Sequence, residues 1–336
     1  MTTPRRLTPS ARTRRTFLAA AVLALALLGC KSKAEGGAHG ATGQPTKLRF
    51  AFVTNNSSDF WNIATKGVDK AKVDFGIDAD VFRPLKGEVS DQQRFLEDIL
   101  VQNFDGVAIS PIDAEAMTPL LDKVSVRMPV VCADSDATHS KRIAYVGSDN
   151  VEAGRVAGRA AIAALDAAGS KTGKVALFVG RMDMQNSIDR KQGIDETLGK
   201  VSGLEILPIF LDGADRAKAK KNVEDALARY PDLVLMMGIW SYNGPALAGA
   251  TRASSRTKKP AIVTFDEEEE TLKAIEDGLV YATIAQKPFE FGYQAMKALK
   301  DAKDGKPVPK SIDTGLTTVT KANLAPFWEQ LRALKK

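Results

Sequence analysis

From residue 47 onward, short apolar runs alternate with longer segments in which apolar residues recur at helical spacing. The runs are nearly continuous and rich in β-branched residues, which is typical of strands buried on both faces of a parallel sheet. Helical spacing is found in residues 60–75 and 89–104. This alternation predicts an α/β fold with right-handed crossovers. The predicted strands are residues 48–53, 106–109, 130–133, 143–146, 175–179, 204–211, 233–236, 261–265 and 280–285.

The order of elements repeats in the second half of the chain. Residues 104–109 follow one predicted helix, and residues 230–235 follow another at a similar point of a second helix–strand series. Two such halves predict two lobes of similar size. In open parallel sheets a ligand binds outside the carboxyl ends of the strands. The residues that follow each strand are therefore the candidates for a functional site.

The predicted strands end in planar hydrogen-bonding groups and aromatic rings. A polar loop of residues 54–59 follows the first strand and closes with Phe60 and Trp61. The side chains after later strands are Asp134, Asn186, Arg190, Trp240, Tyr242, Asp266 and Gln286. Carboxylates, amides and guanidinium groups each grip two neighbouring hydroxyls, and aromatic faces stack on C–H patches. Because no basic cluster or glycine-rich loop for a phosphate accompanies them, this set indicates a polyhydroxylated ring.

Each of these side chains also has a purely structural interpretation. Asp266 is placed to cap a helix that begins with the four glutamates of residues 267–270, whose charges suit a helix N-terminus. Phe60 is a candidate core residue, whereas Trp61 lies off the apolar face expected for its helix, which favours a binding role. Positions on a solvated helix face or strand end are the alternative for Asn186, Arg190 and Gln286.

The first 46 residues have the character of an export leader and a tether. Residues 17–28 are twelve apolar residues after a basic segment, too few to span a bilayer as a helix, which needs about 20. Residues 27–30 are similar to a lipobox in which the thiol of Cys30 takes a diacylglycerol. Residues 13–18 resemble a twin-arginine signal, a generic basic segment being the alternative. We expect a lipoprotein signal peptide (1–29), then the lipidated cysteine and a flexible tether (30–46), giving an exported, membrane-anchored protein.

Charge and cysteine content narrow the class of protein. The chain of 336 residues has 47 basic and 41 acidic side chains, a net charge of +6. Five arginines lie in residues 1–29, and without them 42 basic face 41 acidic residues. A nucleic-acid partner is therefore not expected, since it requires a basic face. If Cys30 is lipidated, Cys132 has no disulfide partner, and its apolar neighbours predict a small buried hydrophobe.

Motifs for catalysis are missing from the sequence. The two histidines are His39 and His139, and no HExxH or GxSxG motif or Cys–His pair can be assembled. We expect no enzyme, metal or cofactor, with a carboxylate-pair glycoside hydrolase using Asp134 and Asp266 as the remaining alternative. A sugar-responsive transcription regulator would need an N-terminal helix-turn-helix, where residues 1–46 have a leader and a tether instead.

In the residues that follow its predicted strands, the chain resembles the ribose-binding-protein family, the type I periplasmic solute-binding proteins of ABC sugar importers. The resemblance covers nearly all of residues 47–320, and it is carried by residues 60–61, 144–154, 186–193, 215–219, 265–266 and 282–286. It implies two doubly wound parallel-sheet lobes joined by a three-strand hinge. It also implies that Phe60 and Trp61 flank a sugar ring. The hydroxyls would then be held by Asp134, Asn186, Arg190, Asp266 and Gln286, with Thr54 as a lesser contact and Tyr242 nearby.

The resemblance also implies where the lobes meet and what they bind. Hinge crossings at residues 148–149, around 286–287 and near Asp313 give one lobe of 47–148 plus 287–312. The other lobe is 149–286 plus 313–336. A monomer that closes around its sugar and docks on membrane permease subunits is expected. A sensor that passes the signal to a histidine kinase or a chemoreceptor is the alternative.

Three departures from the family pattern bear on the ligand. Ser135 follows Asp134 where the pattern has an arginine, and Tyr242, beside Trp240, falls near the place of an asparagine. Residues 57–58 are serines where the family has asparagine. The loss of a cation and the gain of an aromatic ring leave another pentose, a hexose or a polyol as suitable as ribose.

Overall fold

The computed structural model describes residues 47–85, 87–170 and 172–335. The signal peptide predicted over 1–29, the lipidation of Cys30 and the tether of 30–46 lie outside the described residues. Within those described ranges, no helix has the length and apolar character needed to cross a membrane. Cys132 is unpaired and buried, and burial raises the pKa of its thiol to about 12. The prediction of a small buried hydrophobe at this position is confirmed.

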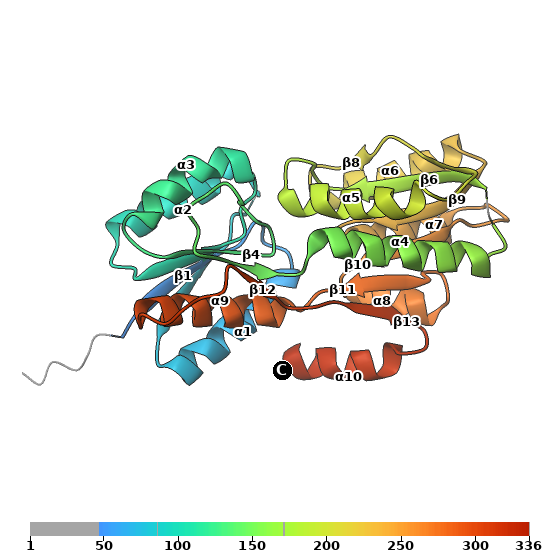
Figure 1. Cartoon of the computed structure of the whole chain (residues 1–336). Coiled ribbons are helices and arrows are strands. Elements are labelled where there is room, and N and C mark those ends of the chain that lie inside the picture. The colour runs from blue at the N-terminus through green and yellow to red at the C-terminus, as the bar shows by residue number, and fades with distance from the viewer. Residues whose placement is uncertain (1–46, 86, 171, 336) are drawn as a thin grey trace, which may run out of the picture. The chain divides into compact units, whose positions relative to one another are not determined.

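The first of two sheets is fully parallel, with the strand order β12-β5-β4-β3-β1-β2. Its strands β1, β4 and β12 are labelled in Figure 1. Its strands are β1 (Arg49–Val53), β2 (Asp78–Phe82), β3 (Gly106–Ile109), β4 (Val130–Ala133), β5 (Ala144–Gly147) and β12 (Ser311–Asp313). One face is covered by α1 (Phe60–Phe75) and α9 (Pro288–Lys303). The other face is covered by α2 (Val89–Val101) and α3 (Ala114–Ser125).

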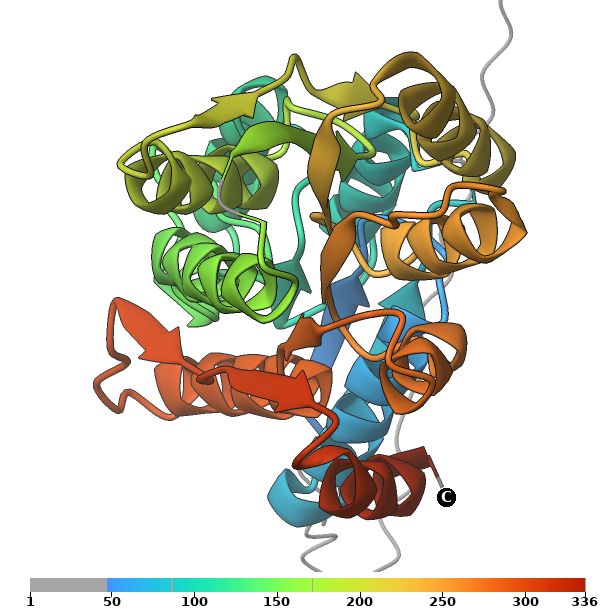
Figure 2. The same cartoon turned by 90° about the vertical axis from the view of Figure 1, so that its right-hand side faces the viewer.

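The second sheet has the order β13-β11-β10-β9-β6-β7, with β8 also paired to β6, and only β13 runs antiparallel among its described strands. Its strands are β6 (Gly173–Val179), β7 (Leu204–Ile206), β8 (Phe210–Leu211), β9 (Leu233–Gly238), β10 (Ala261–Phe265), β11 (Ala282–Ala285) and β13 (Thr317–Thr320). Figure 2 shows helices on both faces. They are α4 (Asn150–Ala167) and α5 (Gln185–Leu198) on one face, and α6 (Arg216–Arg229), α7 (Asn243–Ala253), α8 (Glu269–Glu276) and α10 (Leu324–Lys335) on the other.

Both sheets repeat one topology. The order β2-β1-β3-β4-β5 of the first corresponds to β7-β6-β9-β10-β11 of the second, a doubly wound arrangement. Phe50 and Phe52 of β1 pack toward α1 and α9, while Ala51 and Val53 pack toward α2 and α3. Both faces of the strand are therefore buried, which is why its sequence is continuously apolar. The predicted α/β fold with two doubly wound lobes is confirmed.

Some element boundaries differ from the prediction. Residues 204–211 form two short strands, because Pro208 between them cannot donate a ladder hydrogen bond. Strand β2 was missed because Asp78 and Asp80 interrupt its apolar character. It is the edge strand of its sheet, so such polar residues are tolerated there, and Asp80 pairs with Arg49.

Three connections run between the two sheets. Residues 148–149 lead from β5 to α4, residues 286–287 from β11 to α9, and residues 314–316 from β12 to β13. The first and third are hydrogen-bonded to each other. Thr314 N–H donates to the Gly147 carbonyl at 3.1 Å, and the Ser148 hydroxyl donates to the Gly315 carbonyl at 3.3 Å.

Candidate functional site

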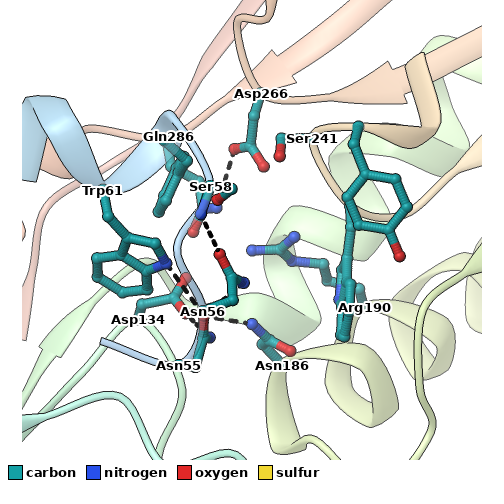
Figure 3. Close-up of a pocket in the computed structure, with 13 residues that line it drawn as sticks. Asn55, Asn56, Ser58, Trp61, Asp134, Asn186, Arg190, Ser241, Asp266 and Gln286 are labelled. Carbon is teal, nitrogen blue, oxygen red and sulfur yellow. Dashed lines mark hydrogen bonds between the residues drawn. The ribbon is translucent and has the colours of Figure 1, made fainter. Parts of the chain in front are cut away.

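Side chains from the carboxyl ends of strands in both sheets line one cavity of about 40 Å³ (Figure 3). Eight of the nine residues predicted for the site are among them. These are Phe60, Trp61, Asp134, Asn186, Arg190, Tyr242, Asp266 and Gln286. Thr54 is the exception, because it is buried behind the wall of the cavity and its hydroxyl donates to the carbonyls of Asn56 and Phe82.

Asp134 and Asp266 occupy equivalent places in the two sheets, directly after β4 and β10. Both have left-handed backbone, with φ of 63° and 65°, which costs about 1–2 kcal/mol for a residue with a side chain. The N–H of each donates at 3.0 Å to a carbonyl of the next strand, Val146 or Ile284. Helix α8 begins at Glu269 with Glu268 at its N-cap, so the interpretation of Asp266 as a helix cap is wrong.

The two carboxylates share one cation. Burial raises the pKa of Asp134 to about 6, and burial likewise raises the pKa of Asp266; the charge of Arg190 opposes both shifts. Asp134 Oδ2 accepts hydrogen bonds from Ser110 Oγ at 3.0 Å and from Asn186 Nδ2 at 3.4 Å. The second of these bonds joins the two sheets. Two buried carboxylates with one arginine suit a ligand that offers many hydroxyl donors.

Arg190 is almost fully buried, with 1% of its surface exposed. Its Nε donates to Asn150 Oδ1 at 2.8 Å, its Nη1 donates to the Ile239 carbonyl at 2.9 Å, and its guanidinium lies 4.5 Å from the centroid of the Phe265 ring. Nη2 is buried with no partner among the described residues. A solvated helix face is therefore the wrong interpretation for Arg190 and for the buried Asn186. Such an unpaired donor is costly unless a ligand oxygen accepts from it.

Gln286 completes the polar lining. Its Nε2 donates to Asp266 Oδ1 at 3.0 Å, whereas its Oε1 is buried and has no partner within the described ranges. The alternative of a solvated strand end is wrong, because the side chain is buried. Arg190 Nη2 and Gln286 Oε1 thus give the cavity one unsatisfied donor and one unsatisfied acceptor.

Phe60 and Trp61 form the aromatic side that faces from the first sheet. Trp61 is only 1% exposed and packs with Ala64 and Val68 in the core between α1 and the sheet. The expectation that Trp61 lies off the apolar face of its helix is therefore wrong: residues 61, 64 and 68 share the buried face. Its Nε1 donates to Asn55 Oδ1 at 3.0 Å, and the ring of Phe60 meets it edge-on at 5.3 Å. Trp61 is both a core residue and part of the cavity lining.

Five further lining residues are not among the nine predicted for the site. They are Asn55, Asn56, Ser58, Trp240 and Ser241. All lie in the loops after β1 and β9, so the position after a strand end was the available signal. Which polar residue of such a loop faces inward depends on the backbone path beyond the strand, and here Asn55 points in where Thr54 was expected. Asn55 bridges Trp61 and Asp134, since its Nδ2 also donates to Asp134 Oδ2 at 3.3 Å.

Metal chemistry has no support in the part of the chain that the structure describes. No group of three or more His, Cys, Asp or Glu side chains there is arranged to hold a metal ion. The lining consists of amides, hydroxyls, aromatic rings, two carboxylates and one guanidinium. That combination suits a neutral ligand held by hydrogen bonds and ring contacts.

Comparison with known proteins agrees with this geometry. Residues 50–307 match the family described as "Periplasmic binding protein domain". The D-allose-binding periplasmic protein of Escherichia coli (strain K12) is 27% identical over 279 residues, which cover 78% of this chain and 89% of that protein. The ribose import binding protein of Bacillus subtilis (strain 168) is 28% identical over 270 residues, covering 80% and 85%.

A solved structure has the same fold. The ABC transporter solute-binding protein of Burkholderia graminis, in complex with D-arabinose, superposes with a TM-score of 0.79 at 27% identity. The match covers 84% of this chain and 98% of that one. From the match over residues 50–307, we conclude that the chain belongs to the periplasmic binding protein domain family.

Proposed function

We propose that this protein is the substrate-binding subunit of an ABC importer, which binds a monosaccharide outside the cytoplasm and delivers it to permease subunits. The observation that carries the proposal is the convergence of both sheets on one cavity. Asp134, Asn186, Arg190, Asp266 and Gln286 supply its hydrogen-bonding groups, and Phe60 and Trp61 supply its rings. The relatives are named for D-allose and ribose, and the solved neighbour binds D-arabinose.

The chemistry of the lining supports a sugar as the ligand. Arg190 Nη2 and Gln286 Oε1 have no hydrogen-bond partner among the described residues. A sugar hydroxyl satisfies either atom, because it both donates and accepts. The carboxylates of Asp134 and Asp266 are strong acceptors for hydroxyl donors. The ring faces of Phe60 and Trp61 suit the C–H patches of the same molecule. No step of this role requires a reaction, and the family membership confirms the prediction that the protein is not an enzyme.

The ligand class is a neutral pentose, hexose or polyol. Ser135 is fully buried, and its hydroxyl has no partner among the described residues. It stands where the ribose-binding pattern has a cation, so the second charge of that pattern is missing here. Trp240 and Tyr242, which follow β9, add ring surface to the cavity lining. These differences support a sugar that departs from ribose in shape.

Binding and transport also require motion. We propose that one lobe comprises residues 47–148 plus 287–312 and the other comprises residues 149–286 plus 313–336. The lobes would be joined at residues 148–149, at 286–287 and near Asp313. Ligand contacts from both lobes favour the closed state. We further propose that residues 1–29 direct export and that a diacylglycerol on Cys30, with the tether of 30–46, holds the monomeric protein at the membrane.

A ligand screen tests the proposal. The purified protein is melted with D-ribose, D-allose, D-arabinose, D-galactose and xylitol, and hits are confirmed by isothermal titration. A ligand at 100 times its Kd adds about 2.7 kcal/mol of stability, so at least one sugar is expected to raise Tm by several degrees. The proposal fails if no sugar raises Tm. Release of free sugar from nitrophenyl glycosides would instead show a glycoside hydrolase.

A further inference from the structure

The side of the cavity that faces from the second sheet is an aromatic wall, which we define as Trp240 and Tyr242. Both follow β9, and they are 8% and 7% exposed. Their ring centroids lie 6.1 Å apart at an angle of 75°. The same cavity is lined by Phe60 and Trp61, which come from the first turn of α1.

The polar atoms of the wall are already occupied by the protein. Trp240 Nε1 donates to Ser187 Oγ at 2.9 Å, and the Tyr242 hydroxyl donates to Asp212 Oδ1. The wall therefore presents mainly ring carbon to the cavity. A ligand hydroxyl directed at it would lose its hydrogen bonds to water without a replacement, whereas a C–H patch would fit.

Asp212 holds both residues of the wall. It lies directly after β8, is 2% exposed, and its N–H donates to the Val179 carbonyl of β6 at 3.2 Å. Oδ2 accepts from Asn243 Nδ2 at 3.0 Å. The Oδ1 of that Asn243 in turn accepts from Trp240 N–H at 3.0 Å. One buried carboxylate is thus tied directly to Tyr242 and, through Asn243, to Trp240.

The backbone around Asp212 leaves the wall no room to move back. Asp212 Oδ1 also accepts from Ala214 N–H at 2.9 Å, which fixes the turn that follows. Gly180, at the end of β6, lies directly behind the rings. A Cβ added there would come within 2.0 Å of Trp240 Cζ3 and 2.6 Å of the Tyr242 hydroxyl. The rings are thus packed against Gly180 on one side, and the hydrogen bonds to Asp212 hold them in that place.

We propose that Asp212 is a positioning residue that fixes the aromatic wall and thereby determines which sugars fit. Asp212 is not among the residues that line the cavity, so it acts through Tyr242 and Asn243. The inference rests on the proposed function for its consequence, since the wall selects a ligand only if a sugar binds here. The claim that Asp212 fixes the wall does not depend on the proposed function, and it can be tested without ligand.

The first test is made on the ligand-free protein with Asp212→Asn. Asn has one acceptor oxygen, so it cannot accept from Tyr242 and also from Asn243, whose amide then faces a second amide donor. Asp215→Asn is the matched control. Asp215 is exposed and caps α6 through the N–H groups of Ala217 and Lys218, and Asn caps equally well.

Hydrogen exchange of residues 238–244, followed by mass spectrometry, reports on the wall through the N–H of Trp240. We expect Asp212→Asn to speed exchange of this segment at least tenfold while β3 and β4 of the first sheet are unchanged. Asp215→Asn is expected to match the wild type. Unchanged exchange in 238–244, or faster exchange everywhere, would overturn the proposal.

The second test measures selectivity by titration with D-ribose, D-allose and D-arabinose. We expect the ratio of the weakest to the tightest Kd to shrink at least fivefold in Asp212→Asn. In a protein that also carries Tyr242→Phe, Asp212→Asn should shrink this ratio less, because the hydrogen bond from Tyr242 to Asp212 is already missing. An equal loss of affinity for all three sugars would overturn the role in selectivity. If no sugar binds the wild type, the proposed function fails, and the exchange experiment still decides whether Asp212 holds the wall.

Discussion

The buried carboxylate of Asp134 illustrates how the site costs the ligand-free protein stability. Its pKa is raised to about 6 by burial, against about 3.9 for an unfolded chain. At a pH between these two pKa values, the folded state binds more protons than the unfolded state. The stability that this group contributes is therefore present below about pH 4 and is lost as pH rises through about 6.

We predict that Asp134→Asn makes the ligand-free protein more stable at pH 7.5 by on the order of 1–3 kcal/mol. Asn carries no charge, and it tolerates the left-handed backbone at this position. Thermal melts at pH 7.5 and pH 4 measure the effect, which should almost vanish at the lower pH. Sugar affinity should fall about tenfold, because a charge-assisted hydrogen bond is lost.

The control for this prediction is Asp113→Asn. Asp113 caps α3 by accepting from Ala116 N–H at 2.8 Å, and Asn preserves that cap. It should leave the stability difference between the two pH values as in the wild type. An Asp134→Asn protein with the wild-type pH dependence would show that Asp134 is not the titrating group.

Residue choice was predictable from the sequence for three side chains that directly follow strands, although not for Thr54, which also follows one. Asp134, Asp266 and Gln286 were found in this way, because the carboxyl ends of parallel strands meet at one edge. The burial of Arg190 and its hydrogen bonds to other parts of the protein were not predictable. Its bonds to Asn150 and to the Ile239 carbonyl join it to residues 40 and 49 positions away, a distance in sequence that no local pattern reports.

At the scale of elements, the site depends on two close helix pairs, one in each lobe. Gly154 of α4 packs against α5, and a Cβ at this position would lie 2.1 Å from the Arg190 carbonyl oxygen. Gly292 of α9 packs against α1, and a Cβ there would lie 2.1 Å from the Ala64 carbonyl oxygen. The two clashes are matched in distance and in kind. Each pair presses on a helix that carries lining residues, since α5 bears Asn186 and Arg190 and α1 bears Phe60 and Trp61.

We predict that Gly154→Ala and Gly292→Ala each destabilise the protein by about 1–3 kcal/mol, the usual cost of overpacking. Both variants should also weaken sugar binding at least tenfold, because α5 or α1 must move with its two lining residues. Urea unfolding and isothermal titration measure the two quantities separately. Wild-type affinity in either variant, despite its lower stability, would mean that the placement of these helices does not set affinity.

The elements that the sequence missed share a physical cause. Strand β13 has three threonines in four residues, and β2 has two aspartates, so neither has the apolar run that marks a central strand. Both lie at sheet edges, where solvent satisfies one side. Trp61 was misjudged for a different reason, because the buried face of α1 extends to the first turn of the helix.

At the scale of the whole molecule, bonds across the cleft link the two lobes in the present state. Asn186 Nδ2 donates to Asp134 Oδ2 at 3.4 Å, and Asn150 Nδ2 donates to the Asp134 carbonyl at 3.2 Å. The cavity between them holds about 40 Å³, room for about three waters. A sugar ring displaces more than that, so binding requires the lobes to adjust around it.

Because most of the lining residues are buried in this state, the protein must also adopt an open state. Trp61, Asp134 and Arg190 are 1–3% exposed, so no sugar reaches them until the lobes part at the three connections. Because the ligand would then contact both lobes, it should bind the closed state more tightly and shift the population toward it. We predict that the sugar with the largest thermal shift lowers the radius of gyration measured by small-angle X-ray scattering. A sugar that gives no thermal shift, at the same concentration, is the control and should leave the radius unchanged. Binding confirmed by titration with no change in radius would contradict closure and remove the hinge role from residues 148–149 and 286–287.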